Sequence, residues 1–248
     1  MYTKTHQGDV KMKVLITGGT RGIGRACVEA FREQGHEVIF LYMQSDDAAA
    51  ELVNKTGAVG IKCDIRSSED VNSAIQSAAD KLGEIDVLIN NAGVSSFGFF
   101  DSISDEEWAR IIDTNLTGAF YVSRAISRLM ISQKRGKIIN IGSMWGKVGA
   151  AMEVHYSASK AGLRGMTLAL AKELGPSGIT VNCIEPGVIR TEMNAVLNDE
   201  ALDILAEQTP LGRLGEPSEV APLALFLASD AASFITGQCI GIDGGFAI

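Results

Sequence analysis

Short apolar runs alternate along the chain with longer segments of helical period. The runs are rich in valine and isoleucine and are bounded by glycine, asparagine or aspartate, which is typical of strands buried on both faces of a sheet. They predict seven strands, at residues 14–17, 37–43, 59–62, 86–89, 136–141, 179–184 and 239–242.

Six helices are expected between these strands, at residues 22–34, 46–55, 68–83, 105–131, 155–175 and 217–228. In the fifth, apolar side chains recur at spacings of three and four and mark one face. Strand–helix alternation predicts right-handed crossovers and a parallel sheet covered on both sides. Because no break in composition divides the chain, we expect one α/β domain over residues 13–248, after a flexible leader of residues 1–12.

Composition and charge exclude several classes of protein. Hydrophobic residues make up 46% of the chain and charged ones 21%, which predicts a globular core. The 22 basic and 30 acidic residues give a net charge of −8, which argues against a nucleic-acid binder. Residues 221–228, the longest apolar stretch, are too few to span a bilayer, and the leader lacks a signal-peptide core.

The four cysteines and three histidines show no metal-ligand spacing. We therefore expect reduced thiols and no metal site, in a cytoplasmic protein that contacts neither nucleic acid nor membrane.

A glycine-rich turn follows the first strand directly, where residues 18–24 read Gly-Gly-Thr-Arg-Gly-Ile-Gly. Glycines let the backbone approach a pyrophosphate, which would bind the amides at the N-terminus of the following helix. The spacing differs from the dinucleotide-binding pattern Gly-x-Gly-x-x-Gly. The alternative is an ordinary glycine-rich turn between a strand and a helix. Its place at the first strand–helix junction favours dinucleotide binding.

Further motifs follow in a fixed order: Asp64 after the third strand, Asn-Asn-Ala-Gly at 90–93, Asn115, Ser143, Tyr156-x-x-x-Lys160, and Pro186-Gly187. With the glycine turn, this order resembles the short-chain dehydrogenase/reductase family, from Met12 to the C-terminus. The resemblance implies one doubly wound Rossmann domain with a seven-stranded parallel sheet. It also implies a homotetramer, which the apolar long helices and the apolar C-terminus fit.

The resemblance implies four catalytic residues: Asn115, Ser143, Tyr156 and Lys160. Tyr156 and Lys160 are four apart and share one face of a helix. A phenol titrates near pH ~10, so the ammonium and an oxidised nicotinamide would have to lower its pKa. Tyr156 would protonate the carbonyl, Ser143 would orient it, and Asn115 would support a proton-relaying water. The alternative for Tyr156 and Lys160 is a surface aromatic–cation pair.

The cofactor contacts are placed by the same resemblance. The expected contacts are Gly18, Thr20, Arg21, Gly22, Ile23, Gly24, Ser45, Asp64, Ile65, Asn91, Ala92, Gly93, Tyr156, Lys160, Pro186, Gly187, Ile189 and Thr191. Two alternatives stay open: residues 90–93 could be a plain polar turn, and Asp64 could cap a helix instead of contacting adenine.

The end of the second strand favours NADP over NAD. NAD-selective folds place an acid there for the ribose 2′-hydroxyl. Here residues 40–45 read Phe-Leu-Tyr-Met-Gln-Ser, and the first acid is Asp46. Arg21 could attract a 2′-phosphate and Ser45 could hydrogen-bond it. Otherwise Arg21 is a solvated loop charge.

Within the family, segments 210–217 and 242–246 look most like 3-oxoacyl-[acyl-carrier-protein] reductases. The resemblance implies a 3-oxoacyl thioester, with acyl carrier protein as one option for its carrier. Carrier docking would use basic residues before the fifth and sixth strands; Lys134 and Arg135 supply the first, whereas Ser177 departs from the second.

The substrate is expected between loops 94–103 and 144–155 and a lid over 190–212. Trp145 stands where the family usually has a small residue, and it would narrow the pocket, stack on a flat substrate or pack under the lid. His155 is expected in a loop.

Two other functions stay open. One is an alcohol, polyol or sugar dehydrogenase of the same family, and the other is a dinucleotide sensor without turnover. The complete set of four catalytic residues favours an enzyme, because a sensor does not need it.

Overall fold

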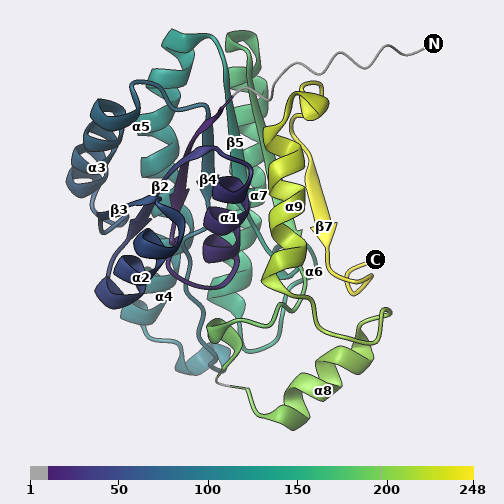
Figure 1. The fold of residues 1–248 in the computed structure, drawn as a ribbon. Helices are drawn as coiled ribbons and strands as arrows, with labels where there is room; N and C mark the ends of the chain where they lie inside the picture. Colours follow the sequence, from purple (N-terminus) through teal and green to yellow (C-terminus); the bar gives the residue numbers. More distant parts are fainter. Residues whose placement is uncertain (1–10, 196) are drawn as a thin grey trace.

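A single all-parallel sheet of seven strands forms the centre of the structure (Figure 1). Its strands lie in the order β3-β2-β1-β4-β5-β6-β7. The structure is a computed structural model that describes residues 11–195 and 197–248. The strands are β1 (Lys13–Thr17), β2 (Glu37–Tyr42), β3 (Val59–Lys62), β4 (Val87–Asn90), β5 (Gly136–Ile141), β6 (Ile179–Pro186) and β7 (Cys239–Ile242). All seven predicted strands and the predicted parallel sheet are confirmed.

Helices cover both faces of the sheet, which confirms the doubly wound α/β fold (Figure 1). They are α1 (Gly22–Glu33), α2 (Asp46–Thr56), α3 (Ser68–Leu82), α4 (Asp105–Ile112), α5 (Gly118–Gln133), α6 (Trp145–Val148), α7 (Val154–Leu174), α8 (Asp199–Gln208) and α9 (Pro217–Ala228).

Two hydrophobic cores lie on opposite faces of the sheet. Val14 and Ile16 of β1 pack into the core that α1, α2 and α9 cover. Leu15 points the other way, into the core under α3, α5 and α7. Successive side chains of a strand point to opposite faces, so a strand buried on both faces needs an unbroken apolar run. This is why the apolar runs located the strands so closely.

The predicted helix 105–131 is confirmed in position, but it is not α-helical throughout. The structure has α4, then a π-helical turn over Asp113–Thr117, then α5. The wide turn carries Asn115, which is 1% exposed. Its amide bonds the backbone of Val94, a contact far along the chain that helical periodicity cannot reveal.

Helices α6 and α8 were not predicted. Helix α8 is capped by Asn198, whose side chain accepts a hydrogen bond from the Ala201 amide at 2.9 Å. None of its residues is buried, and it projects from the body of the molecule (Figure 1). It therefore lies within the predicted lid range of 190–212, but as an ordered helix rather than as a loop.

Most of the expected leader falls on residues 1–10, which lie outside the described residues. At the beginning of the described part, the Met12 amide donates to His36 Nδ1 at 3.2 Å. The described helices include none with the length and hydropathy that a membrane crossing requires.

A buried chain of polar side chains ties α5, β4, β5 and α7 together. Asn90 Nδ2 donates to Ser123 Oγ at 2.8 Å and to Asn140 Oδ1 at 2.9 Å. Asn140 Nδ2 donates in turn to Thr167 Oγ1 at 2.8 Å. All four residues are at most 3% exposed, so water cannot replace a lost partner.

Substitution of the central member, Asn140→Leu, is expected to lower the free energy of unfolding by about 2–5 kcal/mol. The change keeps the branched shape but removes partners from Asn90 and Thr167, and an unsatisfied buried polar group costs about 1–3 kcal/mol. Urea unfolding measures the loss. The control is Ser127→Ala, which removes only the exposed hydrogen bond from Ser127 to the Arg124 carbonyl. An Asn140→Leu variant as stable as the control would contradict the assignment.

Candidate active site

A cleft of about 450 Å³ opens at the carboxyl ends of the central strands. The strand order reverses beside β1, which lies between β2 and β4, and such switch points are where open α/β sheets bind ligands. Among the predicted site residues, only Gly24 and Asn115 do not line this cleft. Those that line it are Gly18, Thr20, Arg21, Gly22, Ile23, Ser45, Asp64, Ile65, Asn91, Ala92, Gly93, Ser143, Tyr156, Lys160, Pro186, Gly187, Ile189 and Thr191.

The turn from β1 to α1 forms an open cradle. Gly18 has φ +67° and Gly22 φ +53°, a region that favours glycine. A Cβ at Gly24 would overlap the Gly18 carbonyl oxygen, so Gly24 lies behind the cleft and brings helix and turn together. The helix N-cap, Arg21, makes no side-chain capping bond. The first amides of α1 are thus available to phosphate oxygens, and the cradle fits a dinucleotide.

Segment 90–93 holds this turn in place. Thr17 Oγ1 accepts hydrogen bonds from the Asn91 amide at 3.0 Å and the Ala92 amide at 2.9 Å. Asn91 Nδ2 donates to the carbonyls of Thr17 and Gly18, both at 3.0 Å. The segment is more than a polar turn that ends a strand, because it fixes the glycine turn from beneath and also lines the cleft.

The glycine turn also presents a cation to the cleft. Arg21 is exposed and forms no ion pair with another residue in the described part of the chain. The acid that follows β2, Asp46, pairs with Lys62 at 2.7 Å, and their contact lowers the pKa of that carboxyl. The negative charge of Asp46 is therefore balanced by Lys62.

Asp64 lines the same region and pairs with Arg66 at 2.6 Å. This contact lowers the pKa of the Asp64 carboxyl. The alternative in which Asp64 caps the next helix is wrong, because Ser67 caps α3 by accepting from the Asp70 amide.

Tyr156 and Lys160 share one face of α7 within the cleft. Lys160 Nζ lies 5.6 Å from the centroid of the Tyr156 ring and donates to the Ile141 carbonyl at 2.8 Å. Tyr156 is 9% exposed and Lys160 is 5% exposed, so the alternative of a surface pair is wrong. Ser143 follows β5 and is also buried.

The protonation of this pair is set mainly by burial. Burial raises the pKa of Tyr156 to about 12, and its hydrogen bond with Ser143 acts in the opposite direction. Burial lowers the pKa of Lys160 to about 8. The expectation that the ammonium lowers the pKa of the phenol is thus not met by the protein alone. A further positive charge would have to come from a bound cofactor.

Asn115 lies behind the cleft and connects a substrate loop to α7. Its Oδ1 accepts from the Val94 amide at 2.8 Å, and its Nδ2 donates to the Val94 carbonyl and to Ser159 Oγ. A Cβ at Gly93 would lie 3.2 Å from Asn115 Oδ1 and 3.5 Å from Lys160 Nζ. Asn115 thereby positions the backbone next to Lys160.

The sequence analysis missed or misplaced several residues: Trp145 and Glu153 line the cleft, whereas His155 does not. His155 is not in a loop: it belongs to α7, is 1% exposed, and hydrogen-bonds Ser96 Oγ through Nε2 at 2.8 Å. Trp145 lines the cleft and meets Phe246 edge to face at 5.3 Å. Glu153 also lines it and is 6% exposed. An acid three residues before Tyr156 was the sequence signal that could have been followed.

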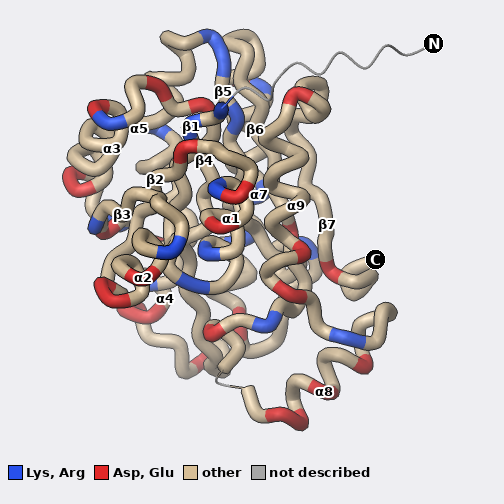
Figure 2. Tube along the Cα trace, viewed as in Figure 1, with Lys and Arg blue, Asp and Glu red and all other residues tan. Residues whose placement is uncertain are grey.

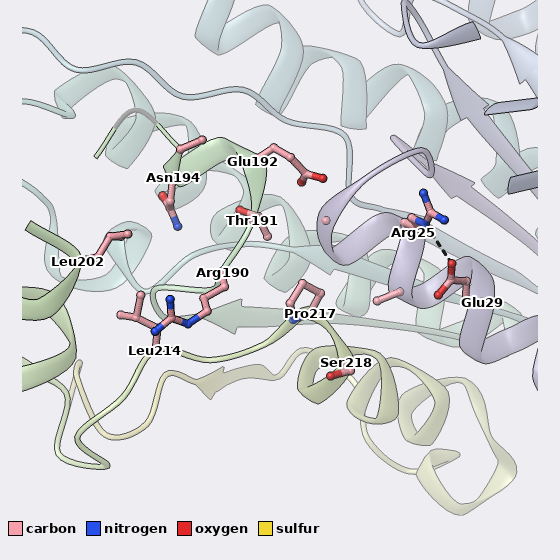
Figure 3. Close-up of a pocket in the computed structure, with 13 residues that line it drawn as sticks. Arg25, Glu29, Arg190, Thr191, Glu192, Asn194, Leu202, Leu214, Pro217 and Ser218 are labelled. Atoms are coloured by element: carbon pink, nitrogen blue, oxygen red, sulfur yellow. Dashed lines mark hydrogen bonds and ion pairs between the residues drawn. The ribbon is translucent and has the colours of Figure 1, made fainter. Parts of the chain in front are cut away.

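A second hollow of about 610 Å³ lies on the other side of the glycine turn, between α1, α9 and the segment after β6 (Figure 3). Thr191 and Glu192 line both hollows. Figure 3 shows them between the α1 side chains Arg25 and Glu29 and the side chain of Asn194. The predicted lid segment therefore forms a wall of the cleft.

Comparison with known proteins agrees with this geometry. A family model described as Enoyl-(Acyl carrier protein) reductase matches residues 18–247. The 3-oxoacyl-[acyl-carrier-protein] reductase FabG of Aquifex aeolicus (strain VF5) is 43% identical, across 93% of this chain and 95% of its own. The acetoacetyl-CoA reductase of Shinella zoogloeoides is also 43% identical, across 93% and 96%. The crystal structure of gox2181 matches with a TM-score of 0.92 at 34% identity over 96% of both chains.

The sheet order, the cleft at its switch point and similarity along almost the whole chain lead to one assignment. This chain belongs to the short-chain dehydrogenase/reductase family, the NAD(P)-dependent oxidoreductases that act on CH–OH and C=O groups.

Proposed function

We propose that the protein is an NADPH-dependent carbonyl reductase in which Tyr156 is the general acid. The observation that carries the proposal is that Ser143, Tyr156 and Lys160 line the same cleft as the glycine turn. A dinucleotide bound on that turn and a carbonyl at Tyr156 would then meet in one space. A sensor without turnover would not need these three side chains together.

The chain's own groups would prepare the carbonyl. A bound nicotinamide supplies a hydride for the carbonyl carbon. Ser143 Oγ donates a hydrogen bond to the carbonyl oxygen, and the Tyr156 hydroxyl gives that oxygen its proton, so that the product is an alcohol. Lys160 binds the ribose hydroxyls and brings positive charge near the phenol. Asn115 holds the loop against α7, and its support of a proton-relaying water stays a prediction.

The glycine turn, segment 90–93 and the stretch from Pro186 to Thr191 would hold the cofactor. NADP is proposed over NAD because β2 ends in Tyr42, without an acid, and because Arg21 has no ionic partner among the described residues. A guanidinium can meet a phosphate with two parallel hydrogen bonds.

A 3-oxoacyl thioester is the first substrate class to test, since the names of two relatives indicate this chemistry. Direct delivery from acyl carrier protein has less support. Lys134 and Arg135 precede β5 and so lie at the amino edge of the sheet, opposite the cleft. Arg135 is also paired with Glu84 at 2.6 Å. An alcohol, polyol or sugar dehydrogenase stays the alternative within the family.

The homotetramer and the cytoplasmic location stay predictions. Apolar side chains that are more than 40% exposed on α4, α5 and α7 support a covered surface, namely Trp108, Phe120 and Leu168. Figure 2 shows basic and acidic residues interspersed over the face in view, with acidic ones along α8, which supports the prediction of no nucleic-acid partner.

The substitution Tyr156→Phe is expected to lower kcat by about 10²- to 10⁴-fold, the usual contribution of a general acid. Cofactor affinity should change little because the ring is retained. NADPH consumption with acetoacetyl-CoA measures kcat, and a fluorescence titration measures affinity. The matched control is Tyr121→Phe, a tyrosine of α5 that packs on the core outside the cleft. Undiminished turnover by Tyr156→Phe would remove the phenol from the mechanism.

The substitution Arg21→Ala is expected to weaken NADPH binding by about 10- to 150-fold and to leave NADH binding little changed. A charge-assisted contact contributes about 1.5–3 kcal/mol, and each ~1.4 kcal/mol is tenfold in affinity. Titration of wild type and variant with both nucleotides tests this. Arg25→Ala is the control, because Arg25 is already paired with Glu51 at 2.7 Å. Tighter binding of NADH than of NADPH by the wild type would contradict the assignment.

Without cofactor, Lys160→Met is expected to be more stable than wild type at pH 7 by about 1–3 kcal/mol, because a buried ammonium is no longer needed. In the folded protein Lys160 releases its proton near pH 8, against 10.5 ordinarily. Between those values the unfolded chain binds more protons, so wild-type stability rises with pH and the difference shrinks.

Urea unfolding at pH 7 and pH 9 measures this difference. Lys172→Met, an exposed lysine of the same helix, is the control and should show no such pH dependence. A gap between wild type and Lys160→Met that widens with pH would show that the ammonium is not the buried form.

A further inference from the structure

The cleft contains a buried carboxyl that the proposed mechanism does not use. Glu153 directly precedes α7, lines the cleft together with Tyr156, and is 6% exposed. Its Oε1 accepts a hydrogen bond from Ser95 Oγ at 2.5 Å. Burial raises the pKa of this carboxyl, and the bond from Ser95 acts against that rise.

Glu153 has no cationic partner within the part of the chain that the structure describes. The contrast is Glu185, also buried, which Arg164 meets at 2.7 Å. Near the cleft, Glu107 is likewise matched, by Arg110 at 2.7 Å. Because buried carboxylates are ordinarily paired, an unpaired one that lines a ligand cleft calls for a counter-charge from the ligand.

Other side chains that line the cleft suit a cation. Phe97, Trp145 and Met193 line the cleft together with Glu153. Aromatic faces combined with a carboxylate are how proteins recognise ammonium groups. The unpaired guanidinium of the cleft, Arg21, lies on the glycine turn, where the dinucleotide phosphates are expected.

We propose that the carbonyl compound taken by this cleft carries an ammonium group, and that Glu153 binds that group beside Tyr156. The inference rests on the proposed carbonyl reduction and specifies its substrate class. An ammonium group would give Glu153 the charge it lacks, whereas a 3-oxoacyl thioester with an uncharged chain would leave the carboxyl unpaired. The two substrate classes can therefore be separated by experiment.

The test uses two methyl ketones of one shape. One carries a terminal trimethylammonium group, which cannot cyclise onto the ketone, and the other carries a tert-butyl group instead. With NADPH, the wild type is expected to prefer the ammonium ketone by about 10- to 100-fold in kcat/KM, the range of a charge-assisted contact. Glu153→Gln, of nearly the same shape, should abolish the preference, and Glu153→Asp, which keeps the charge, should retain most of it.

Glu33→Gln is the matched control, because it makes the same exchange at an exposed position of α1 outside the cleft and should keep the preference. Equal use of both ketones by the wild type would overturn the inference. So would a preference that survives in Glu153→Gln, or a higher kcat/KM for an uncharged 3-oxoacyl thioester. Each of these results leaves the proposed reductase intact.

If neither ketone is reduced, the affinity of the ammonium ketone for the NADP-loaded protein is measured by calorimetry, for the wild type and for Glu153→Gln. Binding that Glu153→Gln weakens by about tenfold or more would support the inference and count against the reductase. Binding that the variant does not weaken would overturn the inference.

Discussion

Burial of the sheet on both faces is the constraint on which the rest of this structure depends. The central strands β1 and β4 are buried and apolar over most of their length, so their polar groups lie at the strand ends and in the segments that follow them. At the carboxyl ends, Thr17 of β1 and Asn91 after β4 are joined by hydrogen bonds. This junction fixes the glycine turn, and the site is built around it.

The charged and titratable groups of the cleft differ in their exposure to water. Arg21 presents an unpaired positive charge at the glycine turn, whereas Tyr156, Lys160 and Glu153 are buried where water stabilises charge poorly. Lys160 loses part of its basicity there and Tyr156 part of its acidity. Each of these groups would gain a favourable partner from a ligand. Burying these groups without such partners costs stability in the unliganded protein, and groups with shifted pKa values are typical of functional sites.

Positioning of the reactive groups depends on contacts between distant segments. The π-helical turn between α4 and α5 aims Asn115 at Val94, and a buried chain from Asn90 to Thr167 joins β4 to α7. Since α7 carries Tyr156 and Lys160, these hydrogen bonds hold the reactive side chains in a fixed position relative to the sheet. Helix α8, by contrast, has no buried residue.

The sequence by itself determined the seven strands, their parallel arrangement and the order of the motifs, because apolar runs and local glycine turns are properties of neighbouring residues. The tertiary structure alone decided which of those residues meet. It placed a π-helical turn at Asn115 and put His155 in a helix, and it buried Tyr156 so that the protein alone raises the pKa of the phenol. It also buried Glu153, for which the described residues supply no counter-charge. Burial and pairing depend on segments far apart in the chain, and no local pattern encodes their distance.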